Sequence, residues 1–233
     1  MDIQVLASSS SGNCYRISDG TTSLLLECGI PIKEIQKGLG YRLSDVAACL
    51  ITHEHKDHCK AVKDLLRAGI DVYMSFGTLK ALGLDGHRIH TVKTSIQFKV
   101  GTFWIMPFKT EHDAAEPIGF LIHSASTLEK LVFITDSYYC KYNFMKLNYI
   151  MVECNYAMDI LKSNIEAGLV PESLKNRLIE SHFSLDNVKE FLKANDLSQV
   201  KEIYLLHLSS GNSDAGRFKR EIQEITGKQV IIA

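Results

Sequence analysis

Four potential metal ligands stand within six positions of the stretch LITHEHKDHCKAV: His53, His55, Asp57 and His58. Residues two apart lie on different faces of a helix, so His53 and His55 cannot share one helical face. The helical zinc motif H-E-x-x-H is also excluded, because Asp57 stands where its second histidine is required. The spacing therefore predicts a metal-binding loop.

The segments on either side of these residues indicate where the loop lies. The apolar run Cys49–Thr52 is typical of a buried strand, and Lys56–Gly69 has the pattern of an amphipathic helix. Ligands between them would gather at the C-terminal end of a strand, where α/β sheets commonly hold their sites.

Three further polar residues stand where apolar strands end. His112 follows the predicted strand Thr102–Phe108, Asp136 ends the run LVFITD, and His207 ends IYLLHL. A single histidine is more often structural than a ligand, and Asp136 could also cap a helix. The repeated coincidence with strand ends, beside the first cluster, favours ligands.

The seven residues divide into two predicted metal sites. His53, His55 and His112 would hold one divalent ion, while Asp57, His58 and His207 hold the other; Asp136 can bridge through its two oxygens. Two such ions can share a hydroxide and clamp the attacking and leaving oxygens of a phosphoryl or acyl displacement. Mixed nitrogen and oxygen donors favour zinc, with manganese or iron as alternatives.

The motif THEHKDH, followed in order by His112, Asp136 and His207, resembles the metallo-β-lactamase fold of binuclear hydrolases. The stretches LASSSSGNCYRI, HDAAEPIGFLI, FITDS, VECNY, SHFSLDNV and LLHLSSGN are similar to the YycJ-like (WalJ) branch, whose members are regarded as exonucleases or metal-dependent phosphodiesterases. The distal motifs also resemble those of RNase Z. The resemblance implies a single domain over residues 1–233, built as an αββα sandwich of two mixed β-sheets flanked by helices.

The similarity to RNase Z also implies a catalytic pair beside the metals. Glu153 and His182 would be hydrogen-bonded, and His182 would give a proton to the leaving oxygen, while Asp57 orients the nucleophile. The alternative is that His182 merely flanks Ser184, which could cap a helix. A Glu153 buried at a strand end would need a partner, which supports the pair. The branch usually carries a histidine where this chain has Tyr156.

Predicted elements cover most of the 233 residues. Early strands form hairpins and later ones alternate with helices, which indicates two mixed sheets covered by helices. The expected strands are Ile3–Ala7, Asn13–Ser18, Thr22–Cys28, Cys49–Thr52, Asp71–Ser75, Arg88–Val92, Ser95–Val100, Thr102–Phe108, Pro117–Ser124, Lys130–Asp136, Tyr149–Cys154, Glu202–Leu208 and Gln229–Ala233. The expected helices are Lys56–Gly69, Leu79–Leu82, Met158–Glu166, Pro171–Glu180, Leu185–Ala194 and Asp214–Thr226.

Composition excludes several classes of protein. The net charge is −1, so no global basic field indicates nucleic-acid binding, and any such surface must be local. Six cysteines without a C-x-x-C pair indicate reduced thiols. No apolar run is long enough to span a membrane, and the first residues lack the pattern of a signal peptide. We therefore expect a cytoplasmic protein.

Three functions fit these residues. The first is a phosphodiesterase or nuclease, exonuclease-like, in which a metal-bridging hydroxide attacks phosphorus. The second is hydrolysis of a small molecule on the same centre: a cyclic nucleotide, lactone, thioester or β-lactam. The third is a non-catalytic metal-binding scaffold, against which the complete ligand set argues.

The loop lengths favour the exonuclease or a small phosphodiesterase. The interval between His112 and Asp136 leaves no room for the long arm with which the tRNA-processing relatives grip tRNA. Nucleic acid or a small phosphodiester substrate would therefore be engaged by the core face and short loops, or by the second subunit of a homodimer.

Overall fold

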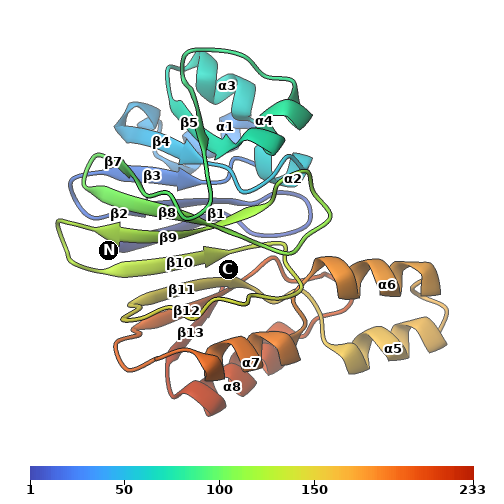
Figure 1. Cartoon of the computed structure of the whole chain (residues 1–233). Helices are drawn as coiled ribbons and strands as arrows, with labels where there is room; N and C mark the ends of the chain where they lie inside the picture. The colour runs from blue at the N-terminus through green and yellow to red at the C-terminus, as the bar shows by residue number, and fades with distance from the viewer. The chain divides into compact units, whose positions relative to one another are not determined.

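The computed structural model describes residues 1–233, apart from the side chain of residue 174. It contains two compact units (Figure 1). Unit 1 comprises Met1–Lys109 and Ala114–Glu129, and unit 2 comprises Thr110–Asp113 and Lys130–Ala233.

Unit 1 holds the first nine strands of the chain. Strands β1 to β6 form one sheet in chain order, antiparallel from β1 to β3 and parallel from β3 to β6. Strands β7, β8 and β9 pair antiparallel. The bounds are β1 Asp2–Ala7, β2 Cys14–Ser18, β3 Ser23–Leu26, β4 Val46–Leu50, β5 Asp71–Ser75, β6 Ile89–Val92, β7 Phe98–Val100, β8 Phe103–Lys109 and β9 Ile118–Ser124.

Short helices of unit 1 pack against the parallel part of its six-stranded sheet. They are α1 Ile32–Gly38, the 3-10 helix η1 Leu43–Asp45, α2 Lys56–Cys59, α3 Val62–Arg67 and α4 Phe76–Leu82. Ile35 of α1 and Leu65 of α3 are fully buried in one cluster with Leu25 and Cys49 of the sheet. Burying a side chain of this size contributes about 1.5–3 kcal/mol, so this cluster anchors the strand ends that carry the first ligands.

The single helix predicted over Lys56–Gly69 is wrong, since the structure has α2 and α3 with a break between them. The carbonyl of His58, which a continuous helix would bond to residue 62, accepts instead from the N–H of Cys28 at 2.8 Å. The N–H of Ala61 in turn donates to the carbonyl of Cys28 at 2.9 Å. Cys28, after β3, thus bonds backbone groups that a continuous helix would pair internally. These bonds fix the turn that carries Asp57 and His58.

Unit 2 holds four parallel strands, in the order β10, β11, β12, β13, with four helices. Helix α7 begins at Ser184, whose side chain accepts from the N–H of Asn187, as predicted for a capping serine. Helix α8 buries Phe218 and Ile222 and packs against α7 and β13 (Figure 1). The bounds are β10 Lys130–Ile134, β11 Tyr149–Glu153, α5 Met158–Glu166, α6 Glu172–Ser181, α7 Leu185–Ala194, β12 Glu202–Leu206, α8 Ala215–Thr226 and β13 Gln229–Ile232.

The predicted α/β class with two mixed sheets flanked by helices is confirmed. Helices α1 and η1 were not predicted from the sequence. Across the described residues, no helix is both long and apolar enough to cross a membrane. The six cysteines are free thiols, as predicted, and the single domain over residues 1–233 stays a prediction.

Candidate metal centre

In unit 1, the predicted ligands follow β4 in residues 51–55 and in helix α2, which together hold three imidazoles close to one another. The rings of His53 and His58 lie 4.2 Å apart between centroids, and those of His53 and His55 lie 4.7 Å apart. Nε2 of His53 is 3.1 Å from Nδ1 of His55, while Nδ1 of His53 is 2.9 Å from the Thr52 hydroxyl. Without a metal, these two facing nitrogens can share one proton in a hydrogen bond. With a metal, each can instead donate its lone pair to the same cation, so the arrangement fits a metal site.

His58 and Asp57 are held from the chain segments beside them. His58 is fully buried, and its Nε2 lies 3.3 Å from Oδ2 of Asp57. Asn13, the last residue of SSSSGN, places its amide nitrogen 3.4 Å from the same Nε2 and donates its backbone N–H to the Asp57 carbonyl at 2.7 Å. The serine-rich loop therefore positions the turn of Asp57 and His58.

Glu27 is a buried carboxylate beside the candidate site that the sequence reasoning missed. Its side chain is fully buried, its Oε2 lies 3.8 Å from Nδ1 of His58, and its Oε1 accepts from the Thr52 N–H at 3.2 Å. Burial raises the pKa of Glu27, while His58 and Thr52 oppose the increase. A carboxylate behind an imidazole fixes the ring and increases its basicity as a ligand. The signal was present in the sequence, because SLLLEC ends an apolar strand on an acid, as LVFITD does.

In unit 2, Asp136 stands two residues beyond β10 and His207 directly beyond β12, both on left-handed backbone. Their φ values are +36° and +52°, a region that non-glycine residues rarely adopt. Nδ1 of His207 lies 2.9 Å from Oδ1 of Asp136 and 3.1 Å from Oε1 of Glu153. Burial opposes a charged His207, yet the two carboxylates outweigh it and raise the pKa of His207 to about 10.

Glu153, the last residue of β11, and His182, directly after α6, form the predicted pair. Nδ1 of His182 donates to Oε1 of Glu153 at 2.6 Å; the glutamate is fully buried and the histidine side chain is 18% exposed. Although burial disfavours charge on both groups, their mutual attraction raises the pKa of His182 and lowers that of Glu153. Because Nδ1 is engaged, Nε2 of His182 is the atom that can exchange a proton with a substrate.

His112 is oriented by a backbone group of unit 2. Its Nδ1 donates to the Ser181 carbonyl at 2.8 Å, which turns Nε2 toward Asp136, whose Oδ2 is 3.7 Å away. A ligating histidine is commonly fixed in this way through its other ring nitrogen. Beside it opens a hollow of about 790 Å³, which Tyr138 and Arg177 also line.

The donor sets of both units fit divalent cations. In unit 2, one ligand atom from each of Asp136, Glu153, His182 and His207 lies within 4.8 Å of the others. In unit 1, His53, His55 and His58 supply nitrogens and Asp57 an oxygen, a mixture that suits zinc and similar ions. Each unit thus gathers the predicted ligands that it carries, and the division of the seven ligands into two sites stays a prediction.

Tyr156, the departure from the branch pattern, is a core residue. Its side chain is 1% exposed and lies beside Ser184, with which it forms an isolated β-bridge. Burial raises the pKa of the Tyr156 phenol to about 12. The aromatic ring thus supports the start of α7.

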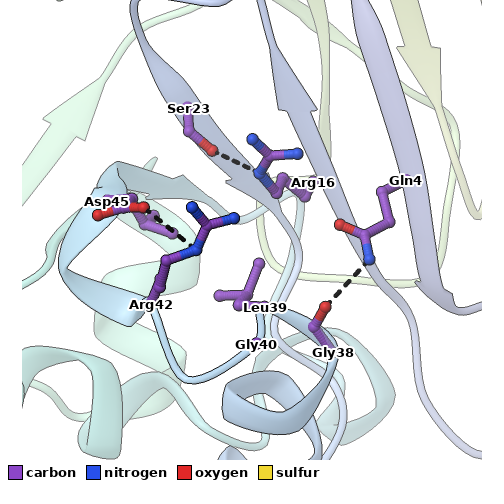
Figure 2. A pocket seen from close by; sticks show the side chains of 9 residues that line it. Gln4, Arg16, Ser23, Gly38, Leu39, Gly40, Arg42 and Asp45 are labelled. Atoms are coloured by element: carbon purple, nitrogen blue, oxygen red, sulfur yellow. Dashed lines mark hydrogen bonds and ion pairs between the residues drawn. The ribbon is translucent and has the colours of Figure 1, made fainter.

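A second hollow, in unit 1, contains none of the predicted site residues. It measures about 180 Å³ and lies between β1, β2 and the α1–η1 connection (Figure 2). Arg16 donates to Ser23 at 3.0 Å, Arg42 lies 3.7 Å from Asp45, and Gln4 donates to the carbonyl of Gly38 at 3.0 Å. The bond from Gln4 connects β1 to the end of α1, whereas the other two contacts are local to the strands and to η1, so each has a structural explanation.

Comparisons with known proteins found similar sequences and structures over most of this chain. The family model described as beta-lactamase superfamily domain matches residues 29–208. A relative, exodeoxyribonuclease YycJ of Bacillus anthracis, is 28% identical over 99% of this chain and 89% of its own length. The metallo-β-lactamase fold protein YhfI of Bacillus subtilis has a TM-score of 0.76 at 17% identity, covering 99% of this chain and 95% of its own. Human tRNase Z, short form, has a TM-score of 0.66 at 15% identity, covering 100% and 96%.

These similarities confirm three predictions. The resemblance to the YycJ-like branch and to RNase Z holds over nearly the whole chain. The match to solved structures confirms the metallo-β-lactamase-type fold. The prediction of a hydrolytic, metal-dependent enzyme is also confirmed at the level of the family and its relatives.

Proposed function

Because the chain belongs to the beta-lactamase superfamily, we propose that it is a metal-dependent phosphodiesterase that removes nucleotides from nucleic-acid ends. The observation that carries this proposal is the 2.6 Å hydrogen bond between Glu153 and His182. A departing sugar oxygen must gain a proton, and an imidazolium held on a buried carboxylate can supply it. The similarity to a protein named exodeoxyribonuclease supports the same substrate class.

We assign the seven predicted ligands to two divalent cations, zinc, manganese or iron. His53, His55 and His112 would hold one ion, Asp57, His58 and His207 the other, and Asp136 both. When bound, such ions lower the pKa of a water and neutralise charge on the phosphoryl group. The donor types in each unit support this assignment.

The chain's own residues then have separate tasks. Asp57, whose side chain is 25% exposed, would accept a hydrogen bond from the attacking water and orient it. His182 would pass the proton on Nε2 to the leaving oxygen, breaking the N–H bond as the P–O bond breaks. Glu153 would keep the His182 ring in place through Nδ1 and stabilise its charged form until a proton from solvent restores it.

The test is to incubate the metal-loaded protein with end-labelled single- and double-stranded DNA and RNA, and with bis(p-nitrophenyl) phosphate. We expect phosphodiester cleavage by the wild type. His182→Ala should keep its metals and lose a factor of about 10²–10⁴ in rate, the usual contribution of a general acid. His87→Ala, at an exposed histidine of unit 1, is the matched control.

Two outcomes would contradict the proposal. Turnover of a lactone, thioester or β-lactam without phosphodiester cleavage under several metals would identify a small-molecule hydrolase. Bound metal without turnover of any substrate would identify a scaffold. A homodimer and a cytoplasmic location stay predictions, which light scattering and cell fractionation would check.

A further inference from the structure

Unit 2 contains a hollow of about 460 Å³, and none of the residues that line it has a role in the proposed function. It lies between the segment of residues 137–143, which follows Asp136, and helix α7. Phe183 and Phe191, which are 0% and 5% exposed, form its apolar floor with ring centroids 6.4 Å apart. The volume is in the range of sites that bind small organic groups. We name it the base hollow.

The lining of the base hollow combines one exposed aromatic ring with two amides. Tyr139 is 54% exposed, a large exposure for an aromatic side chain at the edge of an apolar floor. Asn143 and Asn187 offer both donors and acceptors. The amide nitrogen of Asn187 donates to the Tyr138 carbonyl at 2.8 Å, which holds the segment 137–143 against α7.

The charges around the base hollow favour an anionic group at its mouth. Lys141 and Glu190 both line it, but Lys193 lies 3.0 Å from Oε1 of Glu190 and offsets that carboxylate. The three side chains together leave one positive charge. Because these groups are exposed, this attraction is modest and decreases with salt.

Both walls of the base hollow are tied to the candidate catalytic pair. Oε2 of Glu153 accepts from the N–H of Ser137 at 3.0 Å and from the N–H of Phe183 at 3.1 Å. Its Oε1 accepts from His182. One carboxylate therefore fixes the hollow and the general acid in a single arrangement.

We propose that the base hollow, whose floor residue Phe183 directly follows His182 in the chain, binds a nucleobase of the strand being cleaved. The base stacks on Tyr139 over the apolar floor, the amides of Asn143 and Asn187 bond to its edge, and Lys141 contacts a phosphate. An aromatic platform beside a cation is the usual means of holding unpaired nucleotides, and it accepts any base because every base has a π-face. Since amides can donate and accept, little base preference is expected. This inference rests on the proposed function and assigns its substrate an unpaired nucleotide.

The test compares oligonucleotides that differ in one base. One carries an ordinary nucleotide at the position cleaved, and the other carries an abasic residue there; DNA and RNA versions form separate arms. Tyr139→Ala should lower kcat/KM on the ordinary oligonucleotide by about 5- to 100-fold, the range for loss of one stacked base. It should leave the abasic oligonucleotide unchanged. Tyr139→Phe should behave as the wild type, and Tyr41→Ala, at an exposed tyrosine of unit 1, is the control.

An equal loss on both oligonucleotides, or no loss on either, would overturn the inference. A second measurement separates it from the proposed function. Calorimetric titration of the metal-loaded protein with AMP, dAMP and ribose 5-phosphate tests the hollow without turnover. AMP or dAMP binding tighter than ribose 5-phosphate, and weakened by Tyr139→Ala, supports the base hollow even if no phosphodiester is cleaved. Equal binding of all three would reject the hollow even if the enzyme is a nuclease.

Discussion

Glu153 accepts a 2.6 Å hydrogen bond from His182 through one carboxylate oxygen and uses the other oxygen to hold backbone N–H groups on two segments. Glu153 therefore holds the His182 imidazole with one oxygen and fixes the local backbone with the other. A carboxylate buried to this degree would be costly without such partners. A substitution that removes the charge of Glu153 but keeps one oxygen can separate these two roles.

Replacing Glu153 with glutamine should shift the pH dependence of the reaction. The glutamate charge raises the pKa of His182 against the effect of burial, and the amide lacks that charge. The imidazolium would then be lost at lower pH, so the descending limb of kcat should move to lower pH. Steady-state kinetics across pH would measure this, with Glu180→Gln, on the exposed part of α6, as control. An unmoved limb would show that His182 is not the acid.

Glu27→Gln should weaken metal retention by unit 1. The amide oxygen can still accept from the Thr52 N–H, but the charge that faces His58 is lost. Loss of a partner behind a ligating imidazole typically costs 10- to 100-fold in metal affinity. Elemental analysis after dialysis against graded chelator would measure it. Retention equal to that of the wild type would separate Glu27 from metal binding.

Gly29→Ala should disrupt the turn that carries Asp57. A methyl group at Gly29 would lie 1.6 Å from the Asp57 carbonyl oxygen, a backbone atom that cannot move aside alone. We expect a loss of about 1–3 kcal/mol in unfolding free energy, as for other overpacked sites, together with a loss of metal. Gly211→Ala is the control, because nothing lies within 4 Å of the added atom. Chemical denaturation would compare them, and equal stabilities would contradict the close approach.

Ionised Asp19 should stabilise unit 1, and this stabilisation should be lost in acid. Burial opposes its charge, but hydrogen bonds from Thr102, Thr22 and Ser124 outweigh burial and lower the pKa of Asp19 to about 2. Because the folded-state pKa lies below the unfolded value of 3.8, the stabilisation is present above pH 3.8 and is lost as the pH falls toward 2. We expect about 1–2 kcal/mol from this carboxylate.

The variant Asp19→Asn isolates that contribution. Its amide nitrogen cannot accept from the hydroxyls of Thr102 and Ser124, which now lie 2.6 and 2.7 Å from Oδ2 of Asp19. Stability at neutral pH should fall by about 1–3 kcal/mol, and the dependence on acid between pH 4 and 2 should flatten. Denaturant titrations at several pH values would test this against Asp85→Asn in an exposed loop. An unchanged acid dependence would refute it.

Much of the fold could be predicted because its signals are local. Strand β5 and helices α5 and α7 have the predicted bounds, since their apolar residues follow the period of each element and Ser184 caps α7. The break between α2 and α3 could not be predicted, because the group that takes the helical hydrogen bond belongs to Cys28, distant in sequence. Helix α1 is short, and its first residue follows Pro31 without a side-chain cap, so it lacks a strong start signal.

In the candidate site too, the residues that could be predicted are those with a local sequence signal. His112, Asp136 and His207 could be found because each follows an apolar strand. Two partners of the predicted ligands could not be found in this way: the carbonyl of Ser181 behind His112 carries no side-chain signal, and Glu27 reaches His58 only through a tertiary contact. Glu153 and His182 were predicted by resemblance, and their 2.6 Å hydrogen bond is present in unit 2.

The left-handed backbone at Asp136 and His207 sets a trade-off for anyone who engineers this protein. Glycine or asparagine would relieve the torsional penalty at either position. The same substitution would remove a partner from the buried contacts that His207 makes with Asp136 and Glu153, so a backbone that looks strained in isolation is not a safe target for stabilisation.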